Sequence, residues 1–309
     1  MNERTSTQGH HYVRRTNCAD NLLFADLLGY RSKRASQATL EIDHSVLHWV
    51  TLVGGDGMRV KDITSRFCAK MVRAMRKDGL SAGSIRTYLS NLITLLGFAK
   101  GVRMPDITSL MPPRQPSHKE ALTPRDVSIL HRTPCPHSST AEAFFFAMHT
   151  ALRFSDVASL RWADIADMAD GLYVCKQMVK TGETVQIKLN ATACAILHQK
   201  ASQQHCNLNN VPKKKAVFHD LLSYNTVRND LHDWGEQAHI SVRNLTFHVA
   251  RHTFASAIHA ADIPLATISH LLGHRSLRTT ETYIHSFAAS ERRAVEYLNN
   301  YGLSSNTAE

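Results

Sequence analysis

The sequence predicts a mainly α protein, in which a small helical bundle is followed by a mixed α+β domain with a small antiparallel sheet or hairpin. Three observations support this prediction: two early segments with apolar residues at helical spacing, a proline-rich stretch near residue 110, and a later segment rich in β-branched residues. With 309 residues, of which 43% are apolar and 20% charged, the chain is long enough for one large or two medium domains with hydrophobic cores.

Two helices are predicted in the first part of the chain. Residues 62–79 carry an apolar stripe at helical spacing, with Asp62 as the expected N-cap and Gly79 as the stop. Residues 84–101 carry a second stripe, made of isoleucine and leucine. Packing through these two stripes would bury both helices in one small bundle.

A proline-rich stretch separates the two parts of the chain. Residues 104–119 contain four prolines, which do not fit regular helices or strands, and we expect an interdomain linker there. A weaker helical pattern at 45–52 belongs to the bundle before it, whereas the first 40 residues show no clear pattern. The predicted divisions are therefore 1–40, 41–103, 104–119 and 120–309.

After the predicted linker the pattern changes twice. Thr123 followed by Pro124 and Asp126 is typical of a helix start, because threonine caps, proline suits the first helical position and an acid suits the first turn. Between residues 172 and 189 the chain is rich in β-branched residues around a Thr181-Gly182 turn. This pattern predicts a β-hairpin within a helical domain.

The positive charge is concentrated in the first part of the chain. The formal net charge is +10; residues 1–118 hold 17 Lys and Arg against 9 Asp and Glu, whereas residues 119–309 hold 19 against 17. A basic domain joined to a nearly neutral one suits binding of a polyanion by the first part, although charge alone fits a basic protein without such a partner equally well. The candidate contacts to such a polyanion, which lie off the apolar stripes, are Arg73, Arg76, Lys77, Arg86 and Lys100.

Several classes of protein and site are not expected. No apolar stretch approaches the roughly 18 residues of a membrane span, and the first residues lack the apolar core of a signal peptide, so we expect a cytoplasmic protein without a membrane partner. The six cysteines show no C-x-x-C spacing, which argues against a disulfide framework or a zinc knuckle. His131, Cys135 and His137 have zinc-binding side chains, but the prolines between them indicate a surface loop, and we expect no metal or cofactor.

Two arginines lie next to apolar helical stripes. Arg251 falls at the edge of the stripe within residues 244–261, and His248, three positions earlier, flanks it. Arg153 begins a helical run in a similar setting. A partly buried guanidinium requires an anion, because an uncompensated charge there costs several kcal/mol. One interpretation is an internal ion pair, such as Arg153 with Asp156, and the other is an anionic substrate.

The two arginines fall within four segments that together resemble the tyrosine recombinase family, the phage-type integrases. The resemblance covers most of the chain, its four motifs occur in the family's order and at its usual spacing, and none of six catalytic positions departs from it. Residues 41–103 are similar to the family's core-binding domain, which binds DNA, and residues 120–309 to its catalytic domain. The matching segments are ALRFSDVASLRW, VKTGETVQIKL, TFHVARHTFAS and LLGHRSLRTTETYIH.

The resemblance implies an enzyme that joins a tyrosine to DNA. Tyr283 would attack a DNA phosphodiester in line, forming a 3′-phosphotyrosyl bond and releasing a 5′-hydroxyl. Arg153 and Arg251 would each offer a planar fork of donors to the charge that builds on the non-bridging oxygens. The implied catalytic set is Arg153, Lys180, His248, Arg251, His274 and Tyr283.

The other implied roles concern protons. Lys180, in the hairpin turn, is the implied general acid for the departing 5′ oxygen, and His248 is the implied proton acceptor for the phenol. His274 would donate a hydrogen bond to a phosphoryl oxygen. Because the covalent bond conserves the energy of the broken phosphodiester, rejoining would need neither ATP nor a metal.

The implied substrate is double-stranded DNA, recombined by an integrase- or excisionase-type enzyme of a mobile element. The resemblance also implies a homo-tetramer on paired DNA sites, linked by exchange of the C-terminal tail, with accessory DNA-bending proteins as candidate partners. Two alternatives stay open: relaxation of DNA in the manner of type IB topoisomerases, and a DNA-binding relative without catalysis.

Overall fold

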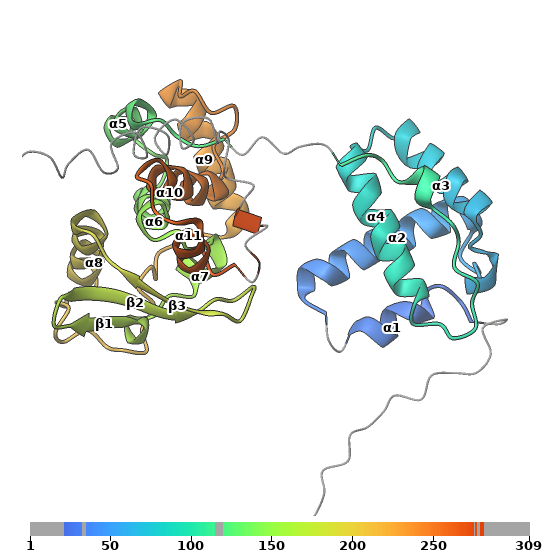
Figure 1. Cartoon of the computed structure of the whole chain (residues 1–309), viewed down its shortest axis with the longest axis horizontal. Coiled ribbons are helices and arrows are strands. Elements are labelled where there is room, and N and C mark those ends of the chain that lie inside the picture. Colours follow the sequence, from blue (N-terminus) through green and yellow to red (C-terminus); the bar gives the residue numbers. More distant parts are fainter. Residues whose placement is uncertain (1–21, 33–34, 115–119, 275, 277–278, 281–309) are drawn as a thin grey trace, which may run out of the picture. The chain divides into compact units, whose positions relative to one another are not determined.

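The chain forms two compact units, Met1–Ser117 and His118–Glu309 (Figure 1). The structure is a computed structural model that describes residues 22–32, 35–114, 120–274, 276 and 279–280. In the first unit the elements are α1 (Asp26–Ser32), α2 (Gln37–Gly54), η1 (Val60–Asp62), α3 (Ser65–Lys77), α4 (Ala82–Leu96) and η2 (Thr108–Leu110). In the second they are α5 (Pro124–Arg132), α6 (Ser138–Thr150), α7 (Phe154–Ala158), η3 (Trp162–Asp164), β1 (Ile165–Met168), β2 (Gly171–Gln177), β3 (Thr184–Lys188), α8 (Ala191–Gln203), α9 (Tyr224–Ala238), α10 (Phe247–Ala260) and α11 (Leu265–Leu271).

The first unit is a bundle built on α2, α3 and α4. Each of these helices begins after a residue whose hydroxyl accepts a hydrogen bond from a main-chain N–H of the first turn, namely Ser36, Thr64 and Ser81. The apolar faces of the three helices meet in one core, in which Trp49 and Leu92 are buried. The predicted helical bundle is therefore confirmed.

Three helix boundaries in this bundle differ from the sequence prediction. Helix α2 is much longer than residues 45–52 and begins at Gln37, within the segment that showed no clear pattern. Helix α3 begins after Thr64 rather than Asp62, because Asp62 closes the short 3-10 turn η1. Helix α4 ends at Leu96 rather than near residue 101, because the N–H groups of Phe98 and Ala99 bond to carbonyls three rather than four residues back.

Part of the predicted linker packs on the first unit. Ile107 is buried in its core, and the 3-10 turn η2 follows directly. The stretch that can connect the two units is therefore shorter than residues 104–119. The assignment of residues 41–103 to DNA binding and of 120–309 to catalysis stays a prediction.

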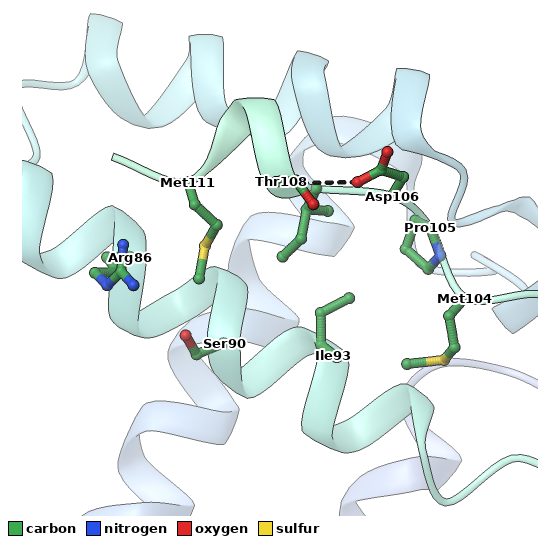
Figure 2. Close-up of a pocket in the computed structure, with 9 residues that line it drawn as sticks. Arg86, Ser90, Ile93, Met104, Pro105, Asp106, Thr108 and Met111 are labelled. Atoms are coloured by element: carbon green, nitrogen blue, oxygen red, sulfur yellow. Dashed lines mark hydrogen bonds between the residues drawn. The ribbon is translucent and has the colours of Figure 1, made fainter. Parts of the chain in front are cut away.

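A pocket of about 570 Å³ lies between α4 and this packed segment (Figure 2). Its walls are mainly apolar, with Ile93 on the helix and Met104 and Met111 on the segment. Arg86 of α4 donates a 2.6 Å hydrogen bond to the carbonyl of Pro112. This bond fixes the segment along the helix, so Arg86 has a structural role in the first unit.

The second unit contains a three-stranded antiparallel sheet in the order β1-β2-β3. Strands β2 and β3 form the hairpin predicted between residues 172 and 189, which is confirmed. Two 2.8 Å hydrogen bonds close its turn, from the N–H of Met178 to the carbonyl of Glu183 and from the N–H of Gly182 to the carbonyl of Met178. Strand β1 was not predicted, because its four residues show no clear alternation of apolar and polar side chains.

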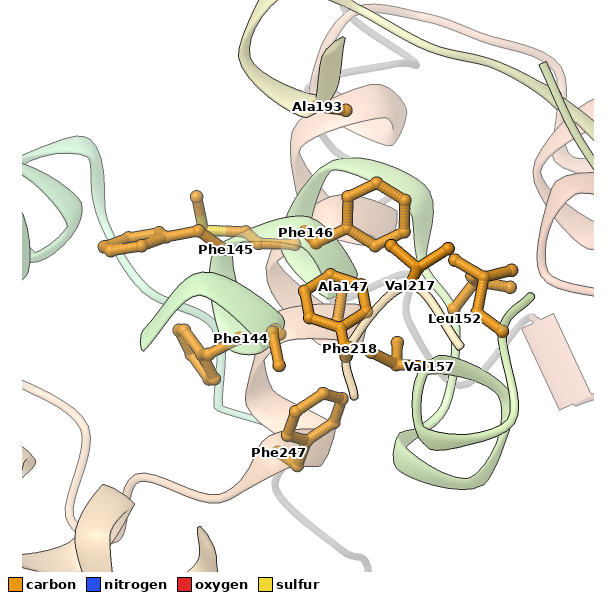
Figure 3. Close-up of a cluster of buried hydrophobic side chains, with 14 of the residues drawn as sticks. Phe144, Phe145, Phe146, Ala147, Leu152, Val157, Ala193, Val217, Phe218 and Phe247 are labelled. Atoms are coloured by element: carbon orange, nitrogen blue, oxygen red, sulfur yellow. The ribbon is translucent and has the colours of Figure 1, made fainter. Parts of the chain in front are cut away.

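Helix α6 packs against both α10 and α8 in the second unit. Figure 3 shows the buried side chains around it. The rings of Phe144 and Phe247 meet edge to face with centroids 6.3 Å apart, and those of Phe146 and Phe218 lie 5.3 Å apart. Val157 of α7 belongs to the same core. The helices that carry both predicted catalytic arginines are thus attached to one packed core.

A buried ion pair also ties elements of this unit together. Lys200 of α8 is fully buried, and its Nζ lies 3.0 Å from both carboxylate oxygens of Asp220 and in contact with Glu142 of α6. Removing a lysine from water is costly unless anions surround it. The two carboxylates meet this requirement and fix α8, α6 and the loop before α9 to one another.

Candidate functional site

Arg153 lies at the junction between α6 and α7. Helix α6 ends at Thr150, the C-cap residue Ala151 adopts the left-handed conformation with φ of 57°, and Arg153 is then the N-cap residue of α7. Its side chain is half-buried, and the terminal nitrogen Nη1 is buried without a hydrogen-bond partner in the described part of the chain. An unsatisfied buried donor costs about 1–3 kcal/mol, more for a charged group. The arginine is therefore positioned to gain from an incoming acceptor.

Asp156 connects this arginine to the β-hairpin. Its carboxylate is fully buried and accepts a 2.7 Å hydrogen bond from the main-chain N–H of Val179 and a 3.3 Å bond from the main-chain N–H of Arg153. The carboxylate thus serves main-chain donors of both segments, rather than forming the side-chain ion pair with Arg153 that was one interpretation of the sequence. The sequence signal for this role was an acid three residues after an arginine at a helix start.

Lys180 follows Val179 directly in the hairpin turn. Its side chain is exposed. The hydrogen bond from Val179 to Asp156 therefore fixes the main chain next to Lys180 and leaves the long side chain in solvent. The turn that carries Lys180 is thus attached through Asp156 to the segment that carries Arg153.

Arg251 is buried in α10, with 1% of its surface exposed. Its Nη1 donates a 2.6 Å hydrogen bond to the carbonyl of Ala151, and its Nη2 donates to the carbonyl of Leu272. These two bonds end on main-chain oxygens that carry no formal charge. The guanidinium thus connects the end of α6 with the end of α11 and places a positive charge between them.

The segment after α11 lies against the hairpin. Gly273 has a φ of +55°, and a Cβ there would meet Val185 at 3.1 Å and Met178 at 3.3 Å. Glycine is required for both the conformation and the close approach. The following His274 is half-buried, and its Nδ1 lies 2.8 Å from the hydroxyl of Thr280.

His248 lies one turn before Arg251 on α10. Its side chain is exposed, and its ring meets that of His252 edge to face with centroids 4.7 Å apart. His252 is buried. Tyr283, the predicted nucleophile, lies outside the described residues, as does the C-terminal tail.

Contacts between segments thus join the parts of the chain that carry five of the six predicted catalytic residues. Asp156 joins the Arg153 segment to the turn with Lys180, and Arg251 joins its own helix to the segments of Ala151 and Leu272. The cations on these segments favour an anionic ligand.

The predicted DNA contacts in the first unit separate into two groups. Arg73, Arg76, Lys77 and Lys100 are exposed. Arg86 is half-buried and bonds to the carbonyl of Pro112, as described above. Its hydrogen bond to the main chain shows a packing role that its position off the apolar stripe did not reveal.

The cluster of zinc-binding side chains has other contacts. The ring of His131 stacks on that of Phe145 with centroids 4.0 Å apart, and Nδ1 of His137 lies 3.0 Å from the carboxylate of Asp230. Among the described residues, no group of three or more His, Cys, Asp or Glu side chains is arranged to hold a metal ion. The helices of the same described residues include none long and apolar enough to cross a membrane.

Comparison with known proteins gives a match to the phage integrase family over residues 121–290. The integrase of Salmonella phage P22 is 26% identical over 239 residues, which cover 74% of this chain and 61% of that protein. The chain therefore spans less than two thirds of that relative's length. The tyrosine recombinase XerC of Psychromonas ingrahamii is 25% identical over 280 residues, 84% of this chain and 85% of that protein.

Solved structures share the fold. A lambda integrase dimer bound to a COC′ core site matches with a TM-score of 0.68 at 20% identity, covering 84% of this chain and 93% of that one. A lambda integrase tetramer bound to a Holliday junction has a TM-score of 0.67 at 20% identity, covering 86% and 78%. The Tn1549 transposon integrase in complex with transposon right end DNA has a TM-score of 0.64 at 15% identity, covering 90% and 100%. The mainly α architecture with a small sheet is common to all of them.

Proposed function

Because this chain belongs to the phage integrase family, we propose that it is a site-specific tyrosine recombinase that cuts and rejoins double-stranded DNA. The observation that supports this most is the buried Nη1 of Arg153, which has no partner in the described part of the chain and lies in a segment tied to the Lys180 turn. A DNA phosphate is an anion with oxygens that can accept such a donor.

The proposed reaction begins at Tyr283. Its phenolic oxygen forms a bond to phosphorus while the bond from phosphorus to the 5′ oxygen breaks, so the DNA strand becomes attached through a 3′-phosphotyrosyl bond. In the five-coordinate transition state, negative charge builds on the non-bridging oxygens. Arg153 binds these oxygens, the positive charge of Arg251 stabilises them, and His274 donates a hydrogen bond.

Two proton transfers accompany this exchange. A phenol has a pKa of about 10, so it must lose its proton to an acceptor, which we assign to exposed His248. Lys180 gives a proton to the departing 5′ oxygen, which leaves as a hydroxyl. Attack by the 5′-hydroxyl of a partner strand reverses the sequence of bonds and releases Tyr283. The energy of the phosphodiester is conserved throughout, so the proposal needs neither ATP nor a metal.

A nicked suicide substrate tests this reaction. When the short fragment carrying the 5′-hydroxyl diffuses away, the protein stays attached to the DNA and migrates as a covalent complex on a denaturing gel. We expect Tyr283→Phe to abolish this complex while gel-shift binding persists. A covalent complex that survives the substitution identifies another nucleophile, and binding without any complex in the unsubstituted protein identifies a non-catalytic DNA-binding relative.

The biological reaction that we propose is integration or excision of a mobile element. Similarity to the phage P22 integrase supports this choice, whereas similarity to XerC supports a chromosomal recombinase as the second candidate. The test is recombination between DNA sites taken from the ends of the element that carries the gene. Relaxation of a supercoiled plasmid that lacks such sites would instead indicate topoisomerase-like activity.

We further propose that four copies assemble on paired DNA sites by exchanging C-terminal tails. The lambda integrase neighbour is described as a tetramer bound to a Holliday junction. The acceptor that we assign is an apolar pocket of about 650 Å³ in the second unit, lined by Val127, Met148 and Phe254 among others. It suits the apolar residues Ala294, Val295 and Leu298 of the tail.

The assembly proposal is tested by removing either partner of the contact. Truncation after Ser290 and the substitution Val127→Asp should both leave binding of one DNA site intact and prevent formation of the synaptic complex. Size-exclusion chromatography with light scattering on DNA measures this. Normal synapsis by the truncated chain contradicts tail exchange, and normal synapsis by Val127→Asp alone contradicts the assigned acceptor.

A further inference from the structure

Thr280 is a buried residue directly bonded to a predicted catalytic side chain. Its side chain has no exposed surface, and its hydroxyl lies 2.8 Å from Nδ1 of His274. Thr279, its neighbour in the sequence, is exposed. A buried threonine whose hydroxyl meets an imidazole nitrogen influences which ring nitrogen carries the proton.

The main chain of His274 is held independently of this contact. Its N–H donates a 3.0 Å hydrogen bond to the carbonyl of Ser269, and the preceding Gly273 is packed against the hairpin. The backbone therefore places the residue but leaves rotation of the ring about its own bond undetermined. The hydroxyl of Thr280 supplies a fixed partner for one of the two ring nitrogens.

The chemistry of the partner decides what the other nitrogen can do. A neutral imidazole carries one N–H, so Nε2 can donate only if Nδ1 accepts. A carbonyl or carboxylate next to Nδ1 can only accept, and would hold the proton there. A hydroxyl can either donate to Nδ1 or accept from it, so unlike those groups it allows the neutral tautomer with the proton on Nε2. Where the hydroxyl donates to the neutral ring and accepts from the charged ring, Nε2 keeps its proton in both protonation states.

We propose that Thr280 is a positioning residue that fixes the ring of His274 and sets its neutral tautomer, with the proton on Nε2. The inference rests on the proposed function, in which His274 donates to a phosphoryl oxygen. Thr280 precedes Tyr283 by three residues, so one segment both carries the nucleophile and orients a donor to the same phosphate. In the stretch TTETY, residues 279–283, Thr280 thus has a role in addition to that of the tyrosine.

Nitrogen NMR on histidine-labelled protein tests the tautomer without any reaction. The His274 signals are identified by their loss in His274→Gln, and spectra are taken at about pH 8, above the ordinary histidine pKa. The expected result is an unprotonated Nδ1 and a protonated Nε2. A protonated Nδ1 in the neutral ring of the unsubstituted protein overturns the proposal.

Substitutions then test the hydroxyl. Thr280→Val keeps the shape and removes the hydroxyl, Thr280→Ser keeps the hydroxyl, and Thr279→Val is the matched control on the exposed neighbour. We expect Thr280→Val to mix the two tautomers and to slow covalent-complex formation about tenfold, as the loss of one hydrogen bond predicts. Thr280→Ser should restore the tautomer and most of the rate, and Thr279→Val should change neither.

The outcomes separate this inference from the proposed function. If Thr280→Ser behaves like Thr280→Val, the residue acts by packing and the proposal is wrong. If the unsubstituted protein forms no covalent complex, the proposed function fails, while the NMR spectra still decide whether Thr280 sets the tautomer. If Thr280→Val does not fold, as judged by circular dichroism, the spectra of the unsubstituted protein and of Thr280→Ser decide instead.

Discussion

The carboxylate of Asp156 accepts a 2.7 Å hydrogen bond from the main-chain N–H of Val179, the residue immediately before Lys180. The same carboxylate accepts a hydrogen bond from the main-chain N–H of Arg153. The buried Asp156 therefore holds two segments together: the one that carries Arg153, which is predicted to bind phosphate, and the one that carries Lys180, which is predicted to be the general acid. The geometry of the proposed site depends on a residue that need not touch DNA.

Asp156→Ala should slow covalent-complex formation about 10- to 100-fold, because hydrogen bonds to a charged group contribute about 1.5–3 kcal/mol. The rate is measured by single-turnover cleavage of the suicide substrate. Asp170→Asn is the matched control, since Asp170 lies in the turn of the same sheet but forms an exposed ion pair with Lys188. Equal effects of both substitutions would contradict a specific role for Asp156.

Lys180→Ala should reduce cleavage of ordinary DNA by about 10²- to 10⁴-fold, the usual range for loss of a general acid. Replacing the 5′-bridging oxygen at the cleavage site by sulfur should restore the rate, because a thiol has a pKa of about 8.5 and leaves without a proton. Lys188→Ala serves as the control for loss of an exposed lysine. A variant that stays slow on the sulfur substrate assigns Lys180 a role other than proton donation.

Gly273→Ala should displace the His274 segment from the hairpin. The new Cβ would lie 3.1 Å from Val185, and the left-handed conformation costs a non-glycine residue about 1–2 kcal/mol. Gly79→Ala is the control for conformation alone, because Gly79 has a φ of +80° with nothing within 4 Å of the added carbon. We expect cleavage to fall at least tenfold for Gly273→Ala and to stay unchanged for Gly79→Ala.

Asp126 should make the second unit sensitive to acid. Although burial alone would raise the pKa of this carboxyl, hydrogen bonds from Ser241 and Thr123 lower it to about 2. Because the pKa is lower in the folded state than the unfolded value of about 4, the ionised carboxylate stabilises the folded protein at pH values above about 4. This contribution to the free energy of unfolding is lost as the pH falls towards 2.

The measurement for Asp126 is urea unfolding followed by tryptophan fluorescence in a Trp49→Phe background, which reports on the second unit. Asp126→Asn should lower the free energy of unfolding by about 2 kcal/mol at neutral pH. The difference between the two proteins should shrink as the pH falls from about 4 towards 2. A difference that does not depend on pH would contradict the predicted role of the charge.

Arg251→Lys should destabilise the second unit by about 2 kcal/mol, although the charge is kept. A lysine has one nitrogen and cannot bond to the carbonyls of Ala151 and Leu272 with the geometry of a planar fork. Arg153→Lys should change the free energy of unfolding by less than about 1 kcal/mol, because it removes a donor without a partner in the described part of the chain. Urea unfolding in the same Trp49→Phe background compares the two.

Local patterns were sufficient to predict much of the fold. The helix start at Thr123 is confirmed, with its hydroxyl and the Asp126 carboxylate forming a reciprocal cap, because capping depends on residues close in sequence. The hairpin could also be predicted from its turn residues. Strand β1 and the packing of Ile107 could not be predicted from local sequence, because they depend on partners supplied by other segments.

The candidate site shows the same limit. Motif spacing pointed to Arg153, Lys180, Arg251 and His274, and the structure places their segments in contact. The sequence motifs gave no role to Thr280, and for Asp156 they suggested only a side-chain ion pair. Their bonds to His274 and to the N–H of Val179 depend on where a ring and a turn lie in space. Spacing along a chain contains no such information.

The two arginines of the site would be retained for different reasons during evolution. A descendant that lost the proposed DNA cleavage would still need Arg251, because its side chain joins the ends of two helices through their carbonyls. It would gain nothing by keeping Arg153, whose buried nitrogen has no partner in the described residues. Loss of the residue at position 153 with retention at 251 is therefore the expected mark of a relative that has become inactive.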